Sequence, residues 1–264
     1  MKAKRIVGFL DVLGFSALVS REDFGERFAN YIELIRRIIK SVDETIEHTV
    51  FSDSIVILSK NSSEQDLNNV VRVVSRLTYE FMVSLTLPIK GCIAEGNISS
   101  STSGKDSVIA GPPIVEAYRY EQAQNWVGVM ISPNVLRTFR GVVQKSEVKG
   151  HRTVPEDMID YHDNTQWKYH LQYCYMIPLR GFDIDPDRTF HGLCVLPRSS
   201  LSLDPSAVID DIKGYLAALE KERLYAPDIG AQVKYEKTRL FLHDVQKAVE
   251  QTTSLTVYQE ANKA

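Results

Sequence analysis

The chain has 264 residues, of which 44% are hydrophobic and 25% charged, and its formal net charge is −3. This composition is typical of a globular protein with one large domain, or with a domain and an extension. The negative charge argues against a nucleic-acid binder that neutralises phosphates over a broad surface. No apolar run approaches the roughly 20 residues that cross a bilayer, and Asp11 interrupts the N-terminal apolar run, which makes a signal peptide a poor explanation.

The cysteines and histidines point away from disulfides and zinc. Cys92, Cys174 and Cys194 are odd in number, widely spaced and without a CxxC pair, which fits buried thiols in a reducing compartment. The six histidines show no HExxH or comparable metal-ligand spacing. We therefore expect a cytoplasmic protein with no membrane-spanning segment and no nucleic-acid partner.

The N-terminal stretch carries the first functional signal. Residues 5–10 are apolar without alternation, which predicts a central strand buried on both faces. The strand ends in Asp11, and Gly14 then allows a turn into a helix capped by Ser16 or Ser20. A buried carboxylate needs a partner, and a divalent cation with a phosphate fits this layout. A strand-end aspartate that only caps the next helix explains the stretch equally well.

The next elements place a second aspartate in a similar position. Apolar residues recur at helical spacing over residues 21–42 and 64–85, which predicts two long amphipathic helices. Between them, residues 46–59 are β-rich and are divided by Ser52 and Asp53, which predicts two strands joined by a tight turn. Asp53 therefore begins a strand, as Asp11 ends one.

The middle of the chain continues to alternate between strands and helices. Gly91 and Gly96 in the strand expected over residues 89–98 indicate the close approach of another element or a ligand. A polar hairpin tip follows over residues 99–106, and Pro112 begins a helix that extends to about residue 124. We further expect strands over residues 126–132, 142–148 and 169–179, a short helix over 133–139 and a polar insertion over 151–167.

The last third has a different character. Residues 182–203 look irregular, and two amphipathic helices are expected over residues 205–223 and 231–252. The predicted fold class is α+β, with a mixed antiparallel sheet and long helices on one face. We expect a domain over residues 1–180 and a helical C-terminal extension over 181–264 packed on it.

Four motifs together resemble the class III nucleotidyl cyclases over about residues 5–180. Phe9-x-Asp11-x-x-Gly14-Phe15, with Asp53 in a hairpin turn, resembles the family's two metal-binding aspartates. The strand from Ile89 to Gly96 is similar to the family's basic–x–Gly–Ile–x–x–Gly strand. Residues 111–121 are similar to its Gly-x-x-Val-Asn-x-Ala-x-Arg-x-Glu helix, and residues 148–150 match its Val-Lys-Gly strand end.

The resemblance implies a ferredoxin-like cyclase fold and an enzyme acting on a nucleoside triphosphate. Asp11 and Asp53 would hold two divalent cations, Mn²⁺ or Mg²⁺, and Arg119 would stabilise the charge on the α-phosphoryl group. The triphosphate would be bound by Lys149 and by the backbone of Val12, Leu13, Gly14 and Phe15. A homodimer would share its sites, with the aspartates from one protomer and with Arg119 and Lys149 from the other.

Two of these residues also have simpler readings. Arg119, taken alone, is a solvated helix arginine paired with Glu116 or Glu121, and Lys149 before a glycine is an ordinary turn lysine. Only the combination of motifs favours the functional reading of both.

Departures from the family pattern bear on the substrate. Ser52 replaces the usual glycine before the second aspartate, and Val115 replaces the helix asparagine that orients the ribose. Thr49 and Val108 occupy the two base-pocket positions and fit neither the adenylate nor the guanylate cyclase pattern. With its length and extension, the chain looks similar to the Pycsar antiphage cyclases, which make cyclic UMP or cyclic CMP for a separate effector.

This resemblance leads to a metal-dependent pyrimidine nucleotide cyclase, with UTP preferred over CTP. The alternatives are an adenylate or guanylate cyclase with unusual base contacts, and a non-catalytic cyclase-fold module that binds a nucleotide or a partner.

Overall fold

The computed structural model of the chain describes residues 2–103, 106–139, 174–179, 190–200, 204–224, 226 and 228–261. The strand expected over residues 142–148, Lys149 and the polar insertion over 151–167 lie outside these ranges.

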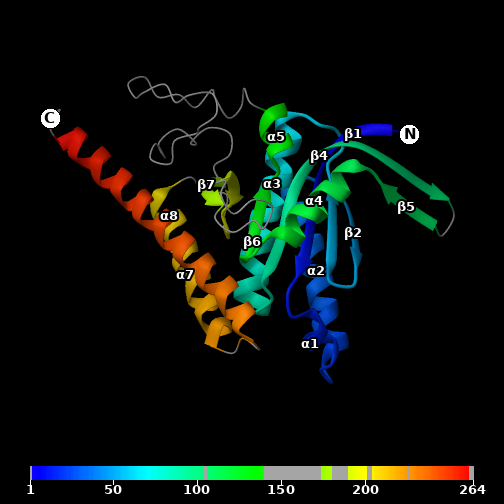
Figure 1. The fold of residues 1–264 in the computed structure, drawn as a ribbon, viewed down its shortest axis with the longest axis horizontal. Coiled ribbons are helices and arrows are strands. Elements are labelled where there is room, and N and C mark those ends of the chain that lie inside the picture. Colours follow the sequence, from blue (N-terminus) through cyan, green and yellow to red (C-terminus); the bar gives the residue numbers. More distant parts are fainter. Residues whose placement is uncertain are drawn as a thin grey trace.

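One mixed sheet forms the centre of the molecule (Figure 1). Its strands follow the order β2-β3-β1-β4-β6-β8-β7, and β5 pairs with β4 outside this path. Among the described strands, only β4 and β6 pair in parallel; the other pairs are antiparallel. The strands are β1 (Lys2–Val12), β2 (Glu47–Phe51), β3 (Ser54–Leu58), β4 (Ile89–Ser103), β5 (Asp106–Ala110), β6 (Gly128–Ile131), β7 (Cys174–Leu179) and β8 (Phe190–Val195).

Helices connect and cover these strands, so the predicted α+β class is confirmed. The π-helix η1 (Phe81–Leu85) continues α3 directly and completes the helix expected over residues 64–85. No described helix is both long enough and apolar enough to cross a bilayer. The α-helices are α1 (Phe15–Val19), α2 (Phe24–Val42), α3 (Glu64–Glu80), α4 (Pro112–Ala123), α5 (Pro133–Thr138), α7 (Pro205–Leu224) and α8 (Ile229–Ala261).

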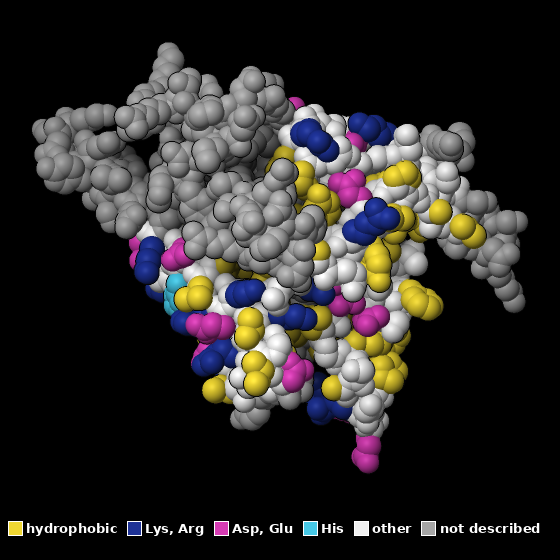
Figure 2. All heavy atoms as spheres, in the orientation of Figure 1, with side chains coloured by type: hydrophobic (Ala, Val, Ile, Leu, Met, Phe, Trp, Pro, Cys, Tyr) yellow, Lys and Arg dark blue, Asp and Glu magenta, His cyan; other side chains and the backbone are white. Residues whose placement is uncertain are grey.

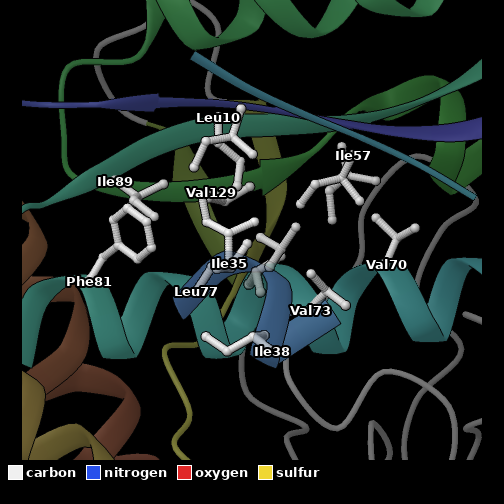
Figure 3. Close-up of a cluster of buried hydrophobic side chains, with 14 of the residues drawn as sticks. Leu10, Ile35, Ile38, Ile57, Val70, Val73, Leu77, Phe81, Ile89 and Val129 are labelled. Atoms are coloured by element: carbon white, nitrogen blue, oxygen red, sulfur yellow. The ribbon is translucent and has the colours of Figure 1, made fainter. Parts of the chain in front are cut away.

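The helices α2 and α3 pack on one face of the sheet. Side chains of a strand point alternately to its two faces, and Leu10 of β1 points toward these helices, where it is fully buried. Figure 3 shows the resulting core, in which strand residues meet α2 and α3. Its labelled members are Leu10, Ile35, Ile38, Ile57, Val70, Val73, Leu77, Phe81, Ile89 and Val129.

The opposite face of the sheet is covered by α4 and by the C-terminal helices. Cys92 and Met130, which alternate with residues of the first core, belong to a second buried cluster with residues of α4, α7 and α8. Figure 1 shows α7 and α8 side by side, and each packs along the other. The long helices expected on one face are α2 and α3, and this expectation is confirmed; α7 and α8, from the part expected to form an extension, pack on the other face.

One detail of the chain differs from the sequence expectation. The strand β8 falls within the stretch expected to be irregular, and Cys194, its penultimate residue, is fully buried opposite Met130 of β6. The sheet therefore includes residues on both sides of position 180, and the division into a domain and an extension stays a prediction. At Gly91, an added Cβ would overlap the carbonyl oxygen of Phe9, so the close approach indicated there is that of β1.

Candidate functional site

The two aspartates lie at the same end of the sheet. Asp11 is the penultimate residue of β1 and pairs with Ser54, the first residue of β3, while Asp53 occupies the turn just before it. The backbone N–H of Val12 donates a hydrogen bond of 2.9 Å to the carbonyl oxygen of Asp53. This bond ties the two acidic positions together through the backbone, although they are far apart in the chain.

The turn that carries Asp53 has an unusual backbone. Ser52 adopts a left-handed conformation with φ of 56°, a region that most residues avoid and glycine enters freely. This geometry gives a physical reason for a glycine at this position in similar turns. Ser52 still makes the turn, so the replacement leaves Asp53 in place.

A buried ion pair lies beside Asp11. Lys90 of β4 is the direct cross-strand neighbour of Asp11, and its ammonium lies 2.5 Å from Oε1 of Glu121 on α4. The side chains of Lys90 and Glu121 are only 8% and 0% exposed. Glu121 also accepts a hydrogen bond of 2.7 Å from Gln122 at its other oxygen. The ion pair fixes α4 against the strand next to the aspartates.

These charges act on Asp11. Burial, followed by the negative charges of Glu121 and Asp53, raises the pKa of Asp11 from 3.8 to about 6. The positive charges of Lys90 and Lys234 oppose this increase and lower the pKa. Two carboxylates and a third buried acid thus gather at one place, where a bound cation would relieve their repulsion.

Tyr31 lies beneath the same region, on the α2 side of the sheet. Its side chain is fully buried against Phe15, Phe28 and Phe81, and its hydroxyl has no hydrogen-bond partner among the described residues. Burial, followed by the charges of Asp53 and Asp11, raises the pKa of the Tyr31 hydroxyl. An unpaired buried hydroxyl close to two carboxylates fits a site that is completed by a further polar group.

The residues present fit an Mg²⁺ or Mn²⁺ site that is shared with a phosphate ligand. No group of three or more His, Cys, Asp or Glu side chains arranged to hold a metal is found among the described residues. Asp11 and Asp53 alone would supply only part of a coordination shell. Mg²⁺ is commonly held in this way, by one or two carboxylates, water and the phosphates of a nucleotide.

The turn after Asp11 is only partly available to bind phosphate through its backbone. The N–H of Val12 is used by Asp53, and the N–H of Leu13 donates to the carbonyl oxygen of Pro88 at 2.9 Å. The sequence had suggested that these two N–H groups bind phosphate. Both are instead occupied by hydrogen bonds within the chain. The N–H groups of Gly14 and Phe15 have no partner in the described part of the chain, and their role stays a prediction.

The helix caps that the sequence suggested are not formed. Gly14, with φ of 79°, occupies the N-cap of α1, and Ser16 lies inside that short helix. Ser20 follows the last residue of α1 and donates its hydroxyl to the carbonyl of Ser16 at 3.0 Å. Gly14 therefore holds the N-cap position of α1, and neither Ser16 nor Ser20 caps this helix.

Arg119 is exposed on α4 and free of acidic partners among the described residues. Glu121, one of the two partners considered for Arg119, is paired with Lys90 instead. Val115, one turn earlier on the helix, is also exposed. Arg119 is not among the four charged residues that shift the pKa of Asp11. The arginine is thus displayed on the surface of the protomer.

The two positions expected to contact the base lie on separate strands. Thr49 lies on β2 opposite Val56, and Val108 lies on β5 opposite Ser101. Both side chains are exposed, and Phe51, two residues after Thr49 on β2, is 79% exposed. Figure 2 shows hydrophobic side chains gathered on the side of the molecule where β2 and β5 lie. That Thr49 and Val108 contact the same base stays a prediction.

Three charged residues of this region were not assigned from the sequence. Lys90 entered only as part of the strand from Ile89 to Gly96, and Glu121 only as a possible partner of Arg119. Lys234 lies on α8, in the part of the chain to which no function was attached. The signal available for Lys90 is its strand position, since a charged residue opposite a strand-end aspartate needs its own partner.

Comparisons with known proteins give similar solved structures only. No protein-family model matches the chain, and no curated protein matches its sequence. The adenylyl cyclase CyaB from P. aeruginosa is 15% identical, with a TM-score of 0.48 over 74% of this chain and 95% of that one. The guanylate cyclase domain of RhGC from Catenaria anguillulae, in complex with GTP, is 13% identical, with a TM-score of 0.47 over 75% of this chain and 99% of that one. At these identities and scores, the activity has to be argued from the residues.

Proposed function

We propose that the protein is a metal-dependent nucleotidyl cyclase that converts UTP, or less readily CTP, into the 3′,5′-cyclic monophosphate and pyrophosphate. The observation that carries the proposal is the pairing of Asp11 and Asp53 at one end of the sheet through the Val12–Asp53 hydrogen bond. This pairing supports the reading of the four motifs as one site.

The chain's own residues have distinct roles in this reaction. The ribose 3′-oxygen attacks the α-phosphorus, the bond to the β-phosphate oxygen breaks, and pyrophosphate leaves with the electron pair. Two divalent cations held by Asp11 and Asp53 would lower the pKa of the 3′-hydroxyl and neutralise the triphosphate. Arg119 would bind the α-phosphoryl oxygens as their charge develops. Lys149, with the N–H groups of Gly14 and Phe15, would bind the remaining phosphates.

The position of Arg119 supports a site shared between two protomers. Arg119 is exposed and without an acidic partner among the described residues. A second copy that faces the first would bring its Arg119 to the aspartates of its neighbour. The functional unit is then a homodimer with two equivalent sites.

The preference for a pyrimidine rests on the base-pocket positions. Thr49 offers one hydroxyl and Val108 offers only apolar contact, so neither supplies the charged groups that read a purine. The ring of Tyr118 lies against Phe9, with ring centroids 5.7 Å apart. Phe9 is two residues before Asp11, so Tyr118 adds bulk near the aspartate. A smaller base suits such a surface. The product would act as a signal read by a separate effector, as in the antiphage cyclases that the sequence resembles.

The metal role is tested by a change of one charge. Asp53→Asn keeps the shape of the side chain and removes the charge that holds the cation. We expect no cyclic product from UTP with Mn²⁺, and a circular dichroism spectrum equal to that of the wild type. Asn61→Asp, which adds a carboxylate on the loop before α3, is the control and should leave turnover unchanged. Normal turnover by the Asp53→Asn variant would overturn the proposed site.

A further inference from the structure

The C-terminal helix α8 is fastened to the end of the sheet that carries the aspartates. The hydroxyl of Thr238 accepts a hydrogen bond of 2.8 Å from the N–H of Val127 and donates to the Val127 carbonyl at 2.9 Å. Thr238 is almost fully buried. Trp126 packs against Phe241 one turn further along α8, with ring centroids 6.2 Å apart. A polar anchor and an aromatic contact thus fix α8 at this point.

The anchor lies in line with Asp11 across the sheet. Val127 immediately precedes Gly128, which pairs with Lys90, and Lys90 in turn pairs with Asp11. Neighbouring strands are about 4.8 Å apart. Gly128 on β6 and Asp11 on β1 are therefore separated by two strand spacings, with Lys90 of β4 between them. The fastened part of α8 therefore lies near the candidate metal site.

Lys234 lies on the same side of α8 as this anchor. It is one helical turn before Thr238, whose hydroxyl oxygen lies 3.0 Å from the Lys234 carbonyl, and residues four apart share a helix face. Its neighbour Tyr235 is buried in the cluster against which Phe9 and Leu13 pack, and these two residues flank Asp11 on the same face of β1. The charge of Lys234 reaches Asp11, whose pKa it lowers.

Lys234 has no ion-pair partner among the described residues. Two acidic residues of the helix pair are engaged elsewhere: Glu220 with Arg223 and Glu236 with Arg239. Figure 2 shows acidic and basic side chains interspersed over α7 and α8, so the surface as a whole is not a basic patch. Lys234, which is partly buried, thus adds a second positive charge, after that of Lys90, near Asp11.

We propose that Lys234 binds the triphosphate of the nucleotide in the same protomer whose Asp11 and Asp53 hold the metal ions. This inference rests on the proposed function and assigns a role at that site to the C-terminal extension. A lysine beside a metal-binding carboxylate repels the cations, and a bound anion offsets this repulsion. A polyphosphate supplies that anion, and a lysine ammonium is a suitable point charge for it.

The experiment measures phosphate binding without turnover. Inorganic triphosphate in excess Mg²⁺ is titrated calorimetrically into the wild type and into the Lys234→Gln, Lys234→Arg and Lys247→Gln variants. Lys247 is an exposed lysine on the same helix and serves as the matched control. We expect Lys234→Gln to weaken triphosphate binding about tenfold or more. Lys234→Arg keeps the charge and should retain most of the affinity, and Lys247→Gln should bind as the wild type does.

Each remaining outcome rejects a definite claim. Equal affinity of Lys234→Gln and Lys247→Gln, with normal binding by the wild type, would overturn the role of Lys234 and leave the proposed function standing. Weaker binding of Mn²⁺ alone by Lys234→Gln, measured well above the pKa of Asp11 where its carboxylate is ionised in both proteins, would also overturn it. At such a pH, loss of a nearby positive charge should tighten metal binding or leave it unchanged. A wild type that binds neither Mn²⁺ nor triphosphate would overturn the proposed function and this inference together.

Discussion

Lys90 and Glu121 form a buried ion pair at 2.5 Å, directly beside the strand position of Asp11. Removal of one partner leaves the other charge buried and uncompensated, which costs about 3–5 kcal/mol. We therefore expect Glu121→Gln to lower the free energy of unfolding by about this amount in urea denaturation. The double variant Lys90→Met/Glu121→Leu removes both charges and should recover most of the loss.

An exposed ion pair is the control for this experiment. Glu236 and Arg239 on α8 also pair at 2.5 Å, but their side chains are 40% and 34% exposed. Arg239→Gln should change the free energy of unfolding by no more than about 1 kcal/mol. A similarly small effect for Glu121→Gln would show that the Lys90–Glu121 pair does not hold α4 on the sheet.

The raised pKa of Asp11, about 6, gives a pH dependence with a definite sign. Because this pKa lies above the ordinary value of 3.8, the folded chain binds the proton more tightly than the unfolded chain. The stabilisation is present below about pH 3.8 and is lost as the pH rises through about 6. In metal-free buffer, the unfolding free energy of the wild type minus that of Asp11→Asn should therefore fall across this window. A difference independent of pH would contradict the raised pKa.

The affinity for Mn²⁺ should depend on the same ionisation of Asp11, but it should rise with pH, whereas the stabilisation by the protonated carboxyl falls. Mn²⁺ requires the ionised carboxylate, so its affinity should fall about tenfold for each pH unit below the pKa of Asp11. Glu121 raises this pKa and Lys90 lowers it. Glu121→Gln should therefore move the midpoint of Mn²⁺ binding to lower pH, and Lys90→Met should move it to higher pH, as measured by calorimetric titration. Identical midpoints in the two variants would contradict this electrostatic account.

The sequence predicts those parts of the fold that depend on local pattern. The strand–turn–strand around Asp53 follows from β-rich segments split by short polar residues, and the long helices follow from 3.6-residue periodicity. The two aspartates meet as the motif order implies, because a strand end and a hairpin turn are both local features.

The remainder depends on contacts that no local pattern encodes. Lys90 and Glu121 are 31 positions apart, and only the packing of α4 on β4 brings them together. The loss of the Val12 and Leu13 N–H groups to Asp53 and Pro88 likewise needs the tertiary structure. The placement of Lys234 follows from the docking of α8, for which Thr238 gives no recognisable signal in the sequence.

A mixing experiment tests the shared active site. Asp11→Asn and Arg119→Ala should each be inactive alone, because each homodimer carries the same lesion in both of its sites. In a mixed dimer both lesions fall in one site and the other stays intact, which restores up to about half of the wild-type activity per dimer. Absence of rescue, with the heterodimer demonstrated by a dual-tag purification, would mean that each site is built within one chain.

Base recognition is tested at Thr49. Thr49→Ala removes one hydroxyl and should lower turnover of UTP by about tenfold, since one lost hydrogen bond is worth about 1.4 kcal/mol. Ser62→Ala, on the loop before α3, is the control. It removes a hydroxyl that donates a hydrogen bond of 2.7 Å to Glu95 and belongs to neither base-pocket position, so it should leave the substrate preference unchanged. Rates for UTP and CTP that do not respond to Thr49→Ala would contradict the assignment of this residue to the base pocket.

The central claim is tested most directly by incubating the protein with ATP, GTP, CTP and UTP separately in the presence of Mn²⁺ and identifying the products by mass spectrometry. We expect 3′,5′-cyclic UMP and pyrophosphate from UTP, less cyclic CMP from CTP, and little product from either purine nucleotide. The Asp11→Asn variant should give none. ATP or GTP as the best substrate would contradict the pyrimidine pocket, and no cyclic product from any of the four would contradict the cyclase itself.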